Sequence, residues 1–176
     1  CWPTWIPTPT TASHKPMPPA SQPSERLRHV LDLAIAAGKE ILRHYPSPTD
    51  VVLKEDRSPL TSADTASHER IVEGLATQWP GIPIVSEESA QADMPTTLPG
   101  GRFWLVDPLD GTKEFLKQSG DFTVNIALMD NALPILGVVH APARGISYLA
   151  DVASGSWRGN PDQGFQAALN LVMASS

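Results

Sequence analysis

The sequence predicts an α+β fold in which helices pack on one face of a mainly antiparallel sheet. Two amphipathic helical patterns come first, and several short apolar runs bounded by Pro and Gly follow from Pro83 onward. Helices followed by adjacent strands are typical of a layered α+β domain. The chain has 176 residues, the length of one domain, and no apolar run long enough to cross a bilayer. We therefore expect a soluble chain with a single folded domain.

The first residues predict a disordered tail. Residues 1–24 contain seven of the 18 prolines and one charged side chain, Lys15. Such a composition cannot bury enough apolar surface to offset the entropy of ordering. We expect the folded domain to cover residues 25–153 and a second tail to cover residues 154–176.

Two helices are expected before Pro83. The first follows Ser24, a favourable N-cap, and its apolar residues recur at helical spacing until Pro46. The second is expected to begin between Ser62 and Thr65 and to end at Pro80-Gly81.

The strands are expected in the middle of the chain. Asp130-Asn131 separates two apolar runs and predicts a hairpin turn between them. The pattern after Gly155 is too weak for us to assign any secondary structure. The expected strands cover residues 84–85, 103–106, 122–128, 135–140 and 146–149.

The charge balance restricts the function classes. Lys and Arg number 13 against 19 Asp and Glu, a formal charge of −6. A general attraction to nucleic acid or anionic lipid is therefore not expected, and a small anionic substrate would need a local cation. The single cysteine, Cys1, excludes an internal disulfide framework and a Cys-rich zinc site.

Carboxylates follow two of the predicted strands. Glu87 and Glu88 come directly after the first strand, and Asp107 comes directly after the second. An acidic cluster alone is typical of a solvated surface. Carboxylates at the ends of neighbouring strands would repel each other, however, and a divalent cation between them would remove that repulsion. Oxygen donors without nearby His or Cys favour Mg²⁺ or Mn²⁺ over Zn²⁺.

The segment after Asp107 predicts a turn into a short helix. Pro108 restricts the backbone, so that Asp107, the carbonyl of Leu109 and Asp110 could face one point, and a helix over residues 111–115 would direct backbone N–H groups at a phosphate. The spacing does not fit an EF-hand, which needs acids at loop positions 1, 3 and 5. It also differs from the D-x-D-x-T pattern of haloacid dehalogenase-type phosphatases, because Asp107 and Asp110 are three residues apart.

These motifs together resemble the inositol monophosphatase superfamily of magnesium-dependent, lithium-sensitive phosphatases. Lys113-Glu114-Phe115 favours its bacterial 3′(2′),5′-bisphosphate nucleotidase branch over the inositol branch, where Thr-Asn-Phe is expected. The resemblance covers about residues 27–151. It is carried by Val85-Ser-Glu-Glu88, Trp104-Leu-Val-Asp-Pro-Leu-Asp-Gly-Thr-Lys-Glu-Phe115 and Gly120-Asp-Phe-Thr-Val-Asn-Ile-Ala-Leu128.

The resemblance implies a metal site. Glu87, Asp107 and the carbonyl of Leu109 correspond to the ligands of one Mg²⁺, and Asp107 and Asp110 to the ligands of a second. It implies two or three Mg²⁺ ions in all, with Mn²⁺ as an alternative.

The resemblance also implies the catalytic and phosphate-binding residues. Asp64 pairs with Thr112 to orient and deprotonate the attacking water, and Glu87 acts with them through its ion. Gly111, Thr112 and Lys113 would bind phosphate. The loop that starts at Lys54 corresponds to the family's mobile segment over the metals.

Several of these residues have simpler alternatives. Asp64 and Thr112 could act only as helix caps. Lys113 could lie in solvent, and Glu88 ranks below Glu87 as a ligand. His140 and Trp104 are expected in the core.

The implied activity is removal of the 3′-phosphate of 3′-phosphoadenosine 5′-phosphate by a metal-activated water, which gives AMP and phosphate. The alternatives are a sugar phosphatase acting on inositol monophosphate or fructose bisphosphate, and a catalytically silent fragment. The expected partner is a small phosphorylated nucleotide rather than a nucleic acid polymer. The expected location is cytoplasmic, with peripheral attachment to the inner membrane as the alternative.

The sequence departs from the family after about residue 153. The family's second layer contributes a Trp-Asp motif, whereas here Trp157 precedes Arg158 and no Trp-Asp occurs. We therefore expect the first half of the family fold, with unrelated sequence at both ends. The expected consequences are weaker binding of the second ion, loss of adenosine contacts, and self-association through an exposed apolar sheet face.

Overall fold

The computed structural model describes residues 22–45, 59–89, 101–131 and 133–167. Most of the expected N-terminal tail and the loop at Lys54 lie outside these ranges. The helices are α1 (Glu25–Arg43), α2 (Pro59–Gln78), α3 (Thr112–Leu116) and the 3₁₀ turn η1 (Pro142–Arg144). The strands are β1 (Ile84–Ser86), β2 (Arg102–Asp110), β3 (Thr123–Asp130), β4 (Leu133–Ala141), β5 (Ile146–Asp151), β6 (Gly155–Asn160) and β7 (Gly164–Ala167).

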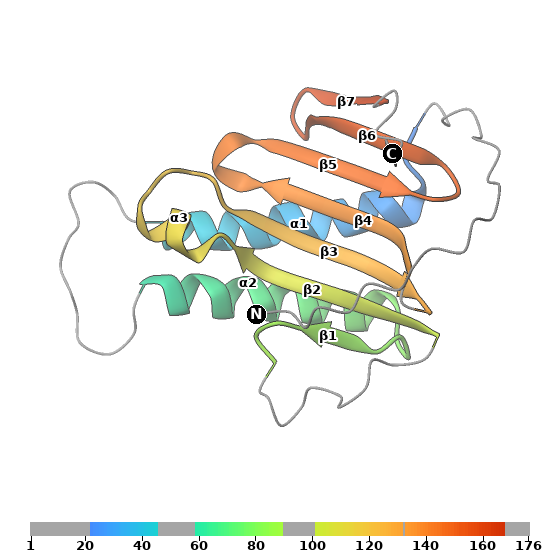
Figure 1. The fold of residues 1–176 in the computed structure, drawn as a ribbon, viewed down its shortest axis with the longest axis horizontal. Coiled ribbons are helices and arrows are strands. Elements are labelled where there is room, and N and C mark those ends of the chain that lie inside the picture. The colour runs from blue at the N-terminus through green and yellow to red at the C-terminus, as the bar shows by residue number, and fades with distance from the viewer. Residues whose placement is uncertain (1–21, 46–58, 90–100, 132, 168–176) are drawn as a thin grey trace, which may run out of the picture.

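The seven strands form one sheet in chain order, and α1 and α2 lie side by side on one of its faces (Figure 1). Strand β1 pairs with β2 in parallel, and every other neighbouring pair is antiparallel. This arrangement confirms the predicted α+β class with helices on a mainly antiparallel sheet.

Helix α1 forms where its pattern predicts. The Ser24 side chain accepts a hydrogen bond from the Leu27 N–H at 3.2 Å and caps the helix. Helix α2 begins at Pro59, earlier than the expected start at Ser62 to Thr65. Proline is tolerated in a first helical turn, because the N–H that it lacks has no partner there.

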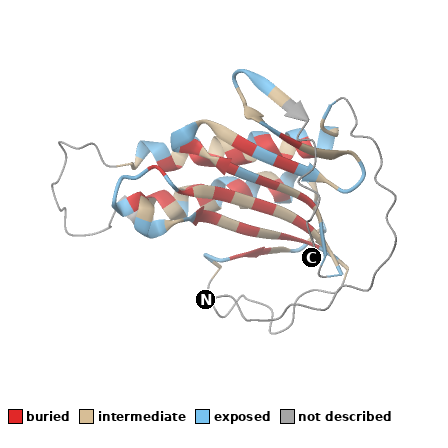
Figure 2. Ribbon diagram, turned by 45° about the horizontal axis from the view of Figure 1, so that its top comes forward, coloured by how far each residue is buried: buried red, intermediate tan, exposed pale blue. Residues whose placement is uncertain are grey.

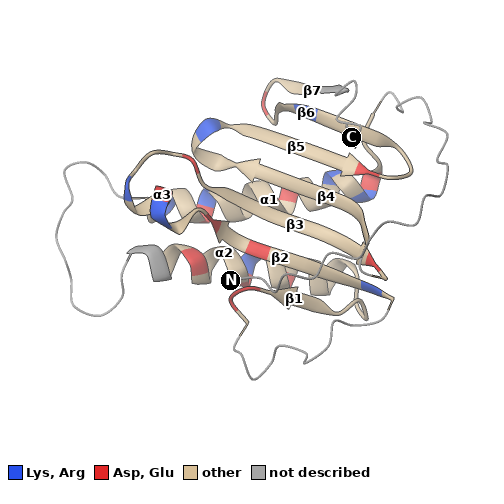
Figure 3. Ribbon diagram, viewed as in Figure 1, with Lys and Arg blue, Asp and Glu red and all other residues tan. Residues whose placement is uncertain are grey.

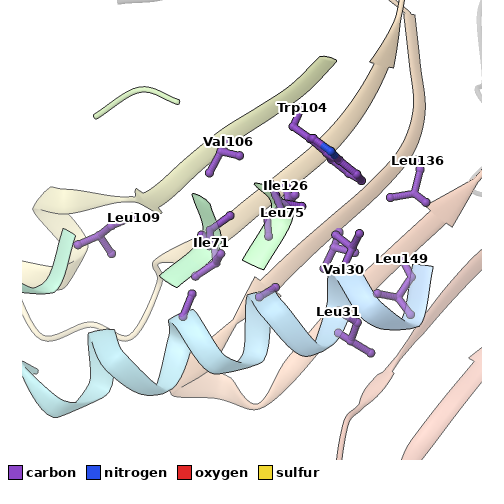
Figure 4. Packing of buried hydrophobic residues seen from close by; sticks show 14 of the residues in the cluster. Val30, Leu31, Ile71, Leu75, Trp104, Val106, Leu109, Ile126, Leu136 and Leu149 are labelled. Carbon is purple, nitrogen blue, oxygen red and sulfur yellow. The ribbon is translucent and has the colours of Figure 1, made fainter. Parts of the chain in front are cut away.

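The core lies between the two helices and the sheet. Figure 4 shows Val30 and Leu31 of α1 and Ile71 and Leu75 of α2 facing the sheet. Trp104 is fully buried and His140 is 5% exposed, which confirms both as core residues. The sheet residues of this core include Trp104, Val106, Ile126, Leu128, Leu136, Val138, Leu149 and Trp157.

Ordered structure extends past residue 153, where the sequence pattern was too weak to assign any secondary structure. Strand β6 pairs with β5, and β7 pairs with β6, each in antiparallel register. Trp157 of β6 is 2% exposed and belongs to the core. These strands are short and rich in Gly, Ser and Asn, so no alternating pattern marks them, and pairing with β5 and burial of Trp157 stabilise them instead.

The second face of the sheet carries no helix in the described part of the chain. Buried and less buried positions alternate along β2 to β4 (Figure 2), and the less buried ones point away from α1 and α2. Val139 of β4 and Tyr148 of β5 are register partners on this face, 39% and 40% exposed. None of the described helices has the length and apolar character needed to span a membrane.

Candidate metal and phosphate site

Three acidic segments meet at the end of the sheet next to α3. They are the first half of α2, the residues after β1, and the end of β2 (Figure 3). Glu87 follows β1, whereas Asp107 lies inside β2, which continues to Asp110 with a register shift after Asp107, so the expectation that the strand ends before Asp107 was wrong. Because β1 and β2 are parallel and Ser86 pairs with Val106, Glu87 still lies beside Asp107. The Glu87 N–H donates to the carbonyl of Val106 at 3.0 Å, which places Glu87 beside the end of β2.

Asp107 is surrounded by other carboxyl groups. Burial is the largest cause that raises its pKa from the usual 3.8 to about 7. The negative charge of Glu87, a hydrogen bond with Glu87 and the charge of Asp110 raise it further, while the backbone of Leu109 hydrogen-bonds the carboxylate and lowers it. Asp107 therefore lies within interaction range of both Glu87 and Asp110, as the metal-site prediction requires.

Asp64 shares the same environment from the helix side. Burial raises its pKa from 3.8 to about 8, followed by a side-chain hydrogen bond with Glu88 and the charges of Glu88, Asp107 and Glu87. The sequence ranked Glu88 below Glu87, yet Glu88 is the direct partner of Asp64. After β1, Glu87 therefore contacts Asp107 of β2, and the next residue, Glu88, contacts Asp64 of α2.

Oxygen atoms in this cluster lack partners. Asp64 Oδ1, Asp107 Oδ1 and Asn125 Oδ1 are buried and accept no hydrogen bond from the protein. Buried acceptors without donors are costly, and a hard cation satisfies them. The donor set is all oxygen, so these residues fit Mg²⁺ or Mn²⁺. Within the described ranges, however, no three His, Cys, Asp or Glu side chains form a ready-made ion site.

Asn125 is a further residue of this site, and the sequence had indicated it only as part of a longer motif. It is the register partner of Asp107, and its Nδ2 donates to Asp110 Oδ2 at 3.1 Å. An amide side chain within an alternating strand is the only sequence signal for Asn125, and its position opposite Asp107 comes from the register of β2 and β3.

The turn into α3 depends on Gly111. Gly111 caps α3 with a left-handed backbone, φ 93°, and a Cβ atom there would lie 2.9 Å from the carbonyl oxygen of Asp121. The Arg144 Nε donates to Asp121 Oδ1 at 2.8 Å and anchors the neighbouring loop.

Gly111→Ala is expected to lower the free energy of unfolding by about 1–2 kcal/mol, because alanine is strained at this φ and crowds the Asp121 carbonyl. Chemical denaturation measures the change. Gly81→Ala is the control, because Gly81 also has φ 93° but nothing lies within 4 Å of its Cβ position. Equal losses in the two variants would show that crowding at Gly111 is unimportant.

The other predicted residues are placed less closely. The Leu109 side chain is buried in the core, so only its backbone is available to the site. Thr112 and Lys113 are exposed on α3. In the described part of the structure, no hydrogen bond joins Asp64 to Thr112, and that pairing stays a prediction.

Comparison with protein families gives a match to the inositol monophosphatase family over residues 22–170. The chain belongs to the inositol monophosphatase family. Its sequence is 51% identical over 126 residues to the 3′(2′),5′-bisphosphate nucleotidase CysQ of Escherichia coli O6:H1. This match covers 70% of this chain and 51% of that protein. CysQ of Aggregatibacter actinomycetemcomitans is 33% identical over 150 residues, 85% of this chain and 56% of that protein.

Solved structures of family members share the fold. The crystal structure of CysQ from Bacteroides thetaiotaomicron superposes with a TM-score of 0.65 at 36% identity, covering 82% of this chain and 52% of that one. An inositol monophosphatase from Thermotoga maritima gives a TM-score of 0.63 at 28% identity, covering 77% and 52%. The chain thus spans about half the length of the relatives it matches. The family match also includes β6 and β7, which the sequence analysis placed in an unrelated tail.

Proposed function

We propose that this chain carries the metal-binding part of a magnesium-dependent phosphomonoesterase that removes the 3′-phosphate of 3′-phosphoadenosine 5′-phosphate. The main support is the meeting of Asp64, Glu87 and Asp107 from three segments, with unpaired buried oxygens on Asp64 and Asp107. The substrate class is taken from the CysQ relatives, which are named 3′(2′),5′-bisphosphate nucleotidases.

Glu87, Asp107, Asp110 and the Leu109 carbonyl would hold the metal ions. When bound, such ions lower the pKa of a water and stabilise the entering and leaving oxygens of an in-line displacement. Asp64 interacts with Glu88, Asp107 and Glu87 of this cluster, and it would serve as the proton acceptor for the attacking water, with Thr112 orienting that water. The exposed Lys113 would neutralise phosphate charge.

The test is phosphate release from 3′-phosphoadenosine 5′-phosphate in Mg²⁺, alongside calorimetric titration of Mg²⁺. We expect saturable Mg²⁺ binding and hydrolysis slower than that of a full-length CysQ. Inositol 1-phosphate is the comparison substrate, because inositol monophosphatases match this fold nearly as well as CysQ does. Preference for inositol 1-phosphate would assign the chain to the inositol branch.

Binding of Mg²⁺ without turnover of either substrate would support a silent fragment, and absence of Mg²⁺ binding would contradict the proposed function. Cytoplasmic location, peripheral membrane attachment and self-association through the open sheet face stay predictions.

A further inference from the structure

In the first half of α2, polar residues share the buried side of the helix with Ala63. Ala63 is fully buried in the core, as are Ile71 and Leu75. One and two turns before Ile71, the same side of the helix presents Ser67, His68 and Asp64. Ser67 is fully buried, although serine is a weak helix former that favours exposed or capping positions. Polar groups on the buried side of a helix are stable only if they find hydrogen-bond partners.

Ser67 finds its partner at the end of β2. Its Oγ donates to the carbonyl oxygen of Pro108 at 2.8 Å, in a buried position. Pro108 lies directly between Asp107 and the Leu109-Asp110 segment. This hydrogen bond therefore joins α2 to the backbone that carries both β2 carboxylates.

His68 finds its partner at the end of β1. Its Nδ1 lies 2.8 Å from Ser86 Oγ, and Ser86 is fully buried. The next residue is Glu87, whose N–H is bonded to the Val106 carbonyl. His68 is four residues from Asp64, so both project from the same side of α2.

We infer that Ser67, His68 and Ser86 are positioning residues that hold the three acidic segments at the spacing needed to bind a divalent cation. The two hydrogen bonds fix the β1 and β2 ends relative to one helical turn of α2, and Asp64 lies on the preceding turn. This inference rests on the proposed function, because it concerns the same cation site. Partners behind metal ligands set ligand orientation, and their loss commonly weakens metal binding about 10- to 100-fold.

A merely structural role for these bonds is the alternative, and the chain provides a matched control for it. His140 Nδ1 lies 2.8 Å from Ser147 Oγ, joining β4 to β5. Ser147 is fully buried, as Ser86 is. No residue of the cation site is adjacent to Ser147 in the sequence or in the register of β5. Ser86→Ala and Ser147→Ala therefore remove the same kind of bond at two different places.

The experiment measures Mn²⁺ affinity by electron paramagnetic resonance in both serine variants. We expect about tenfold weaker Mn²⁺ binding in Ser86→Ala and unchanged binding in Ser147→Ala, with similar losses of thermal stability. Ser67→Ala is expected to act like Ser86→Ala. Equal Mn²⁺ affinities in Ser86→Ala and Ser147→Ala would overturn the inference.

A second measurement needs no metal. Hydrogen exchange of the Glu87 N–H reports the β1 end, and the Trp104 N–H, bonded to the Pro83 carbonyl at 2.8 Å, reports the opposite end of the same ladder. Ser86→Ala should accelerate exchange at Glu87 more than at Trp104. Unchanged exchange at Glu87 would contradict the positioning role. If the unmodified chain binds no Mn²⁺, the proposed function fails, and the exchange result alone decides whether these residues hold the segments.

Comparing two substitutions of His68 separates loss of the hydrogen bond from a general loss of folded protein. In His68→Asn, the amide group lies near the position of the imidazole Nδ1, whereas His68→Ala leaves Ser86 without a partner. We expect His68→Asn to restore most of the Mn²⁺ affinity and Glu87 protection lost in His68→Ala. Failure of Asn to exceed Ala in both measurements would count against the hydrogen bond as the cause.

Discussion

Asp107→Asn is expected to weaken Mg²⁺ binding on the order of 10³-fold and to abolish phosphate release. Two opposite unit charges about 4 Å apart attract each other by about 4 kcal/mol at an effective dielectric constant of about 20, which is a factor of about 10³ in a binding constant, so 10³-fold is the lower bound for a doubly charged ion. The same substitution should stabilise the metal-free protein at pH 8, by about 1–2 kcal/mol, because Asp107 is surrounded by Glu87 and Asp110. Calorimetric Mg²⁺ titration and thermal unfolding in a chelator measure the two effects.

Weaker Mg²⁺ binding together with higher stability of the metal-free protein distinguishes a cation ligand from an acid with a purely structural role. Asp130→Asn is the control, because it removes the same charge from β3 and affects only exposed contacts. These are the ion pair with Arg102, at 3.0 Å, and the hydrogen bond that Asp130 Oδ1 accepts from Asn131 Nδ2, at 2.9 Å. It should leave Mg²⁺ affinity unchanged and stability nearly so. An Asp107→Asn protein that binds Mg²⁺ as tightly as the unmodified chain would refute the assignment of Asp107 as a ligand.

The metal-free protein is expected to lose stability as pH rises from about 4 to 8. The pKa values of Asp107 and Asp64 are raised from 3.8 to about 7 and about 8 in the folded state. Over this interval the folded protein therefore binds more protons than the unfolded chain, so the free energy of unfolding falls with pH and levels off above 8. For these half-buried, solvent-screened groups the loss amounts to about 2–3 kcal/mol. Thermal unfolding in a chelator should show a decrease of roughly 5–10 °C.

Saturating Mg²⁺ should abolish this decrease, because the ion replaces the protons as the neutralising charge. The double variant Asp64→Asn, Asp107→Asn should flatten the profile without metal. If the stability of the metal-free protein rises between pH 5 and 8, the prediction is wrong. Such a rise would show that hydrogen-bond donors or positive charges lower the pKa values of these carboxyl groups in the folded state.

The layered architecture could be predicted from the sequence because its signals are local. The Ser24 cap, the helical stripe of α1 and the alternation in β3 each specify their element within a few residues. The start of α2 was predicted too late, because Pro59 is compatible with a first helical turn. Strands β6 and β7 were missed because pairing with β5, which is not local, stabilises them.

The carboxylates proposed as metal ligands could be predicted from the sequence, but the contacts between the side chains of the site could not. The acids near the ends of two apolar runs indicated that Glu87 and Asp107 would lie close together, although β2 continues through Asp107 to Asp110. The pairing of Glu88 with Asp64 depends on how α2 crosses the end of β1, and one chain's sequence contains no direct signal for such a crossing. Asn125 became apparent only from its register with Asp107.

Strand β1 has three residues and lies at the edge of the sheet, held by one neighbouring strand. Short edge strands open more readily than central ones, so Glu87 and Glu88 follow a strand with less local stability than the central strands of the sheet. Binding of a cation would also favour the molecules in which β1 is paired with β2. The measured affinity would equal the intrinsic affinity multiplied by the fraction of molecules in which these two strands are paired. Any contact that presses β1 against β2 would then tighten ion binding without touching the ion.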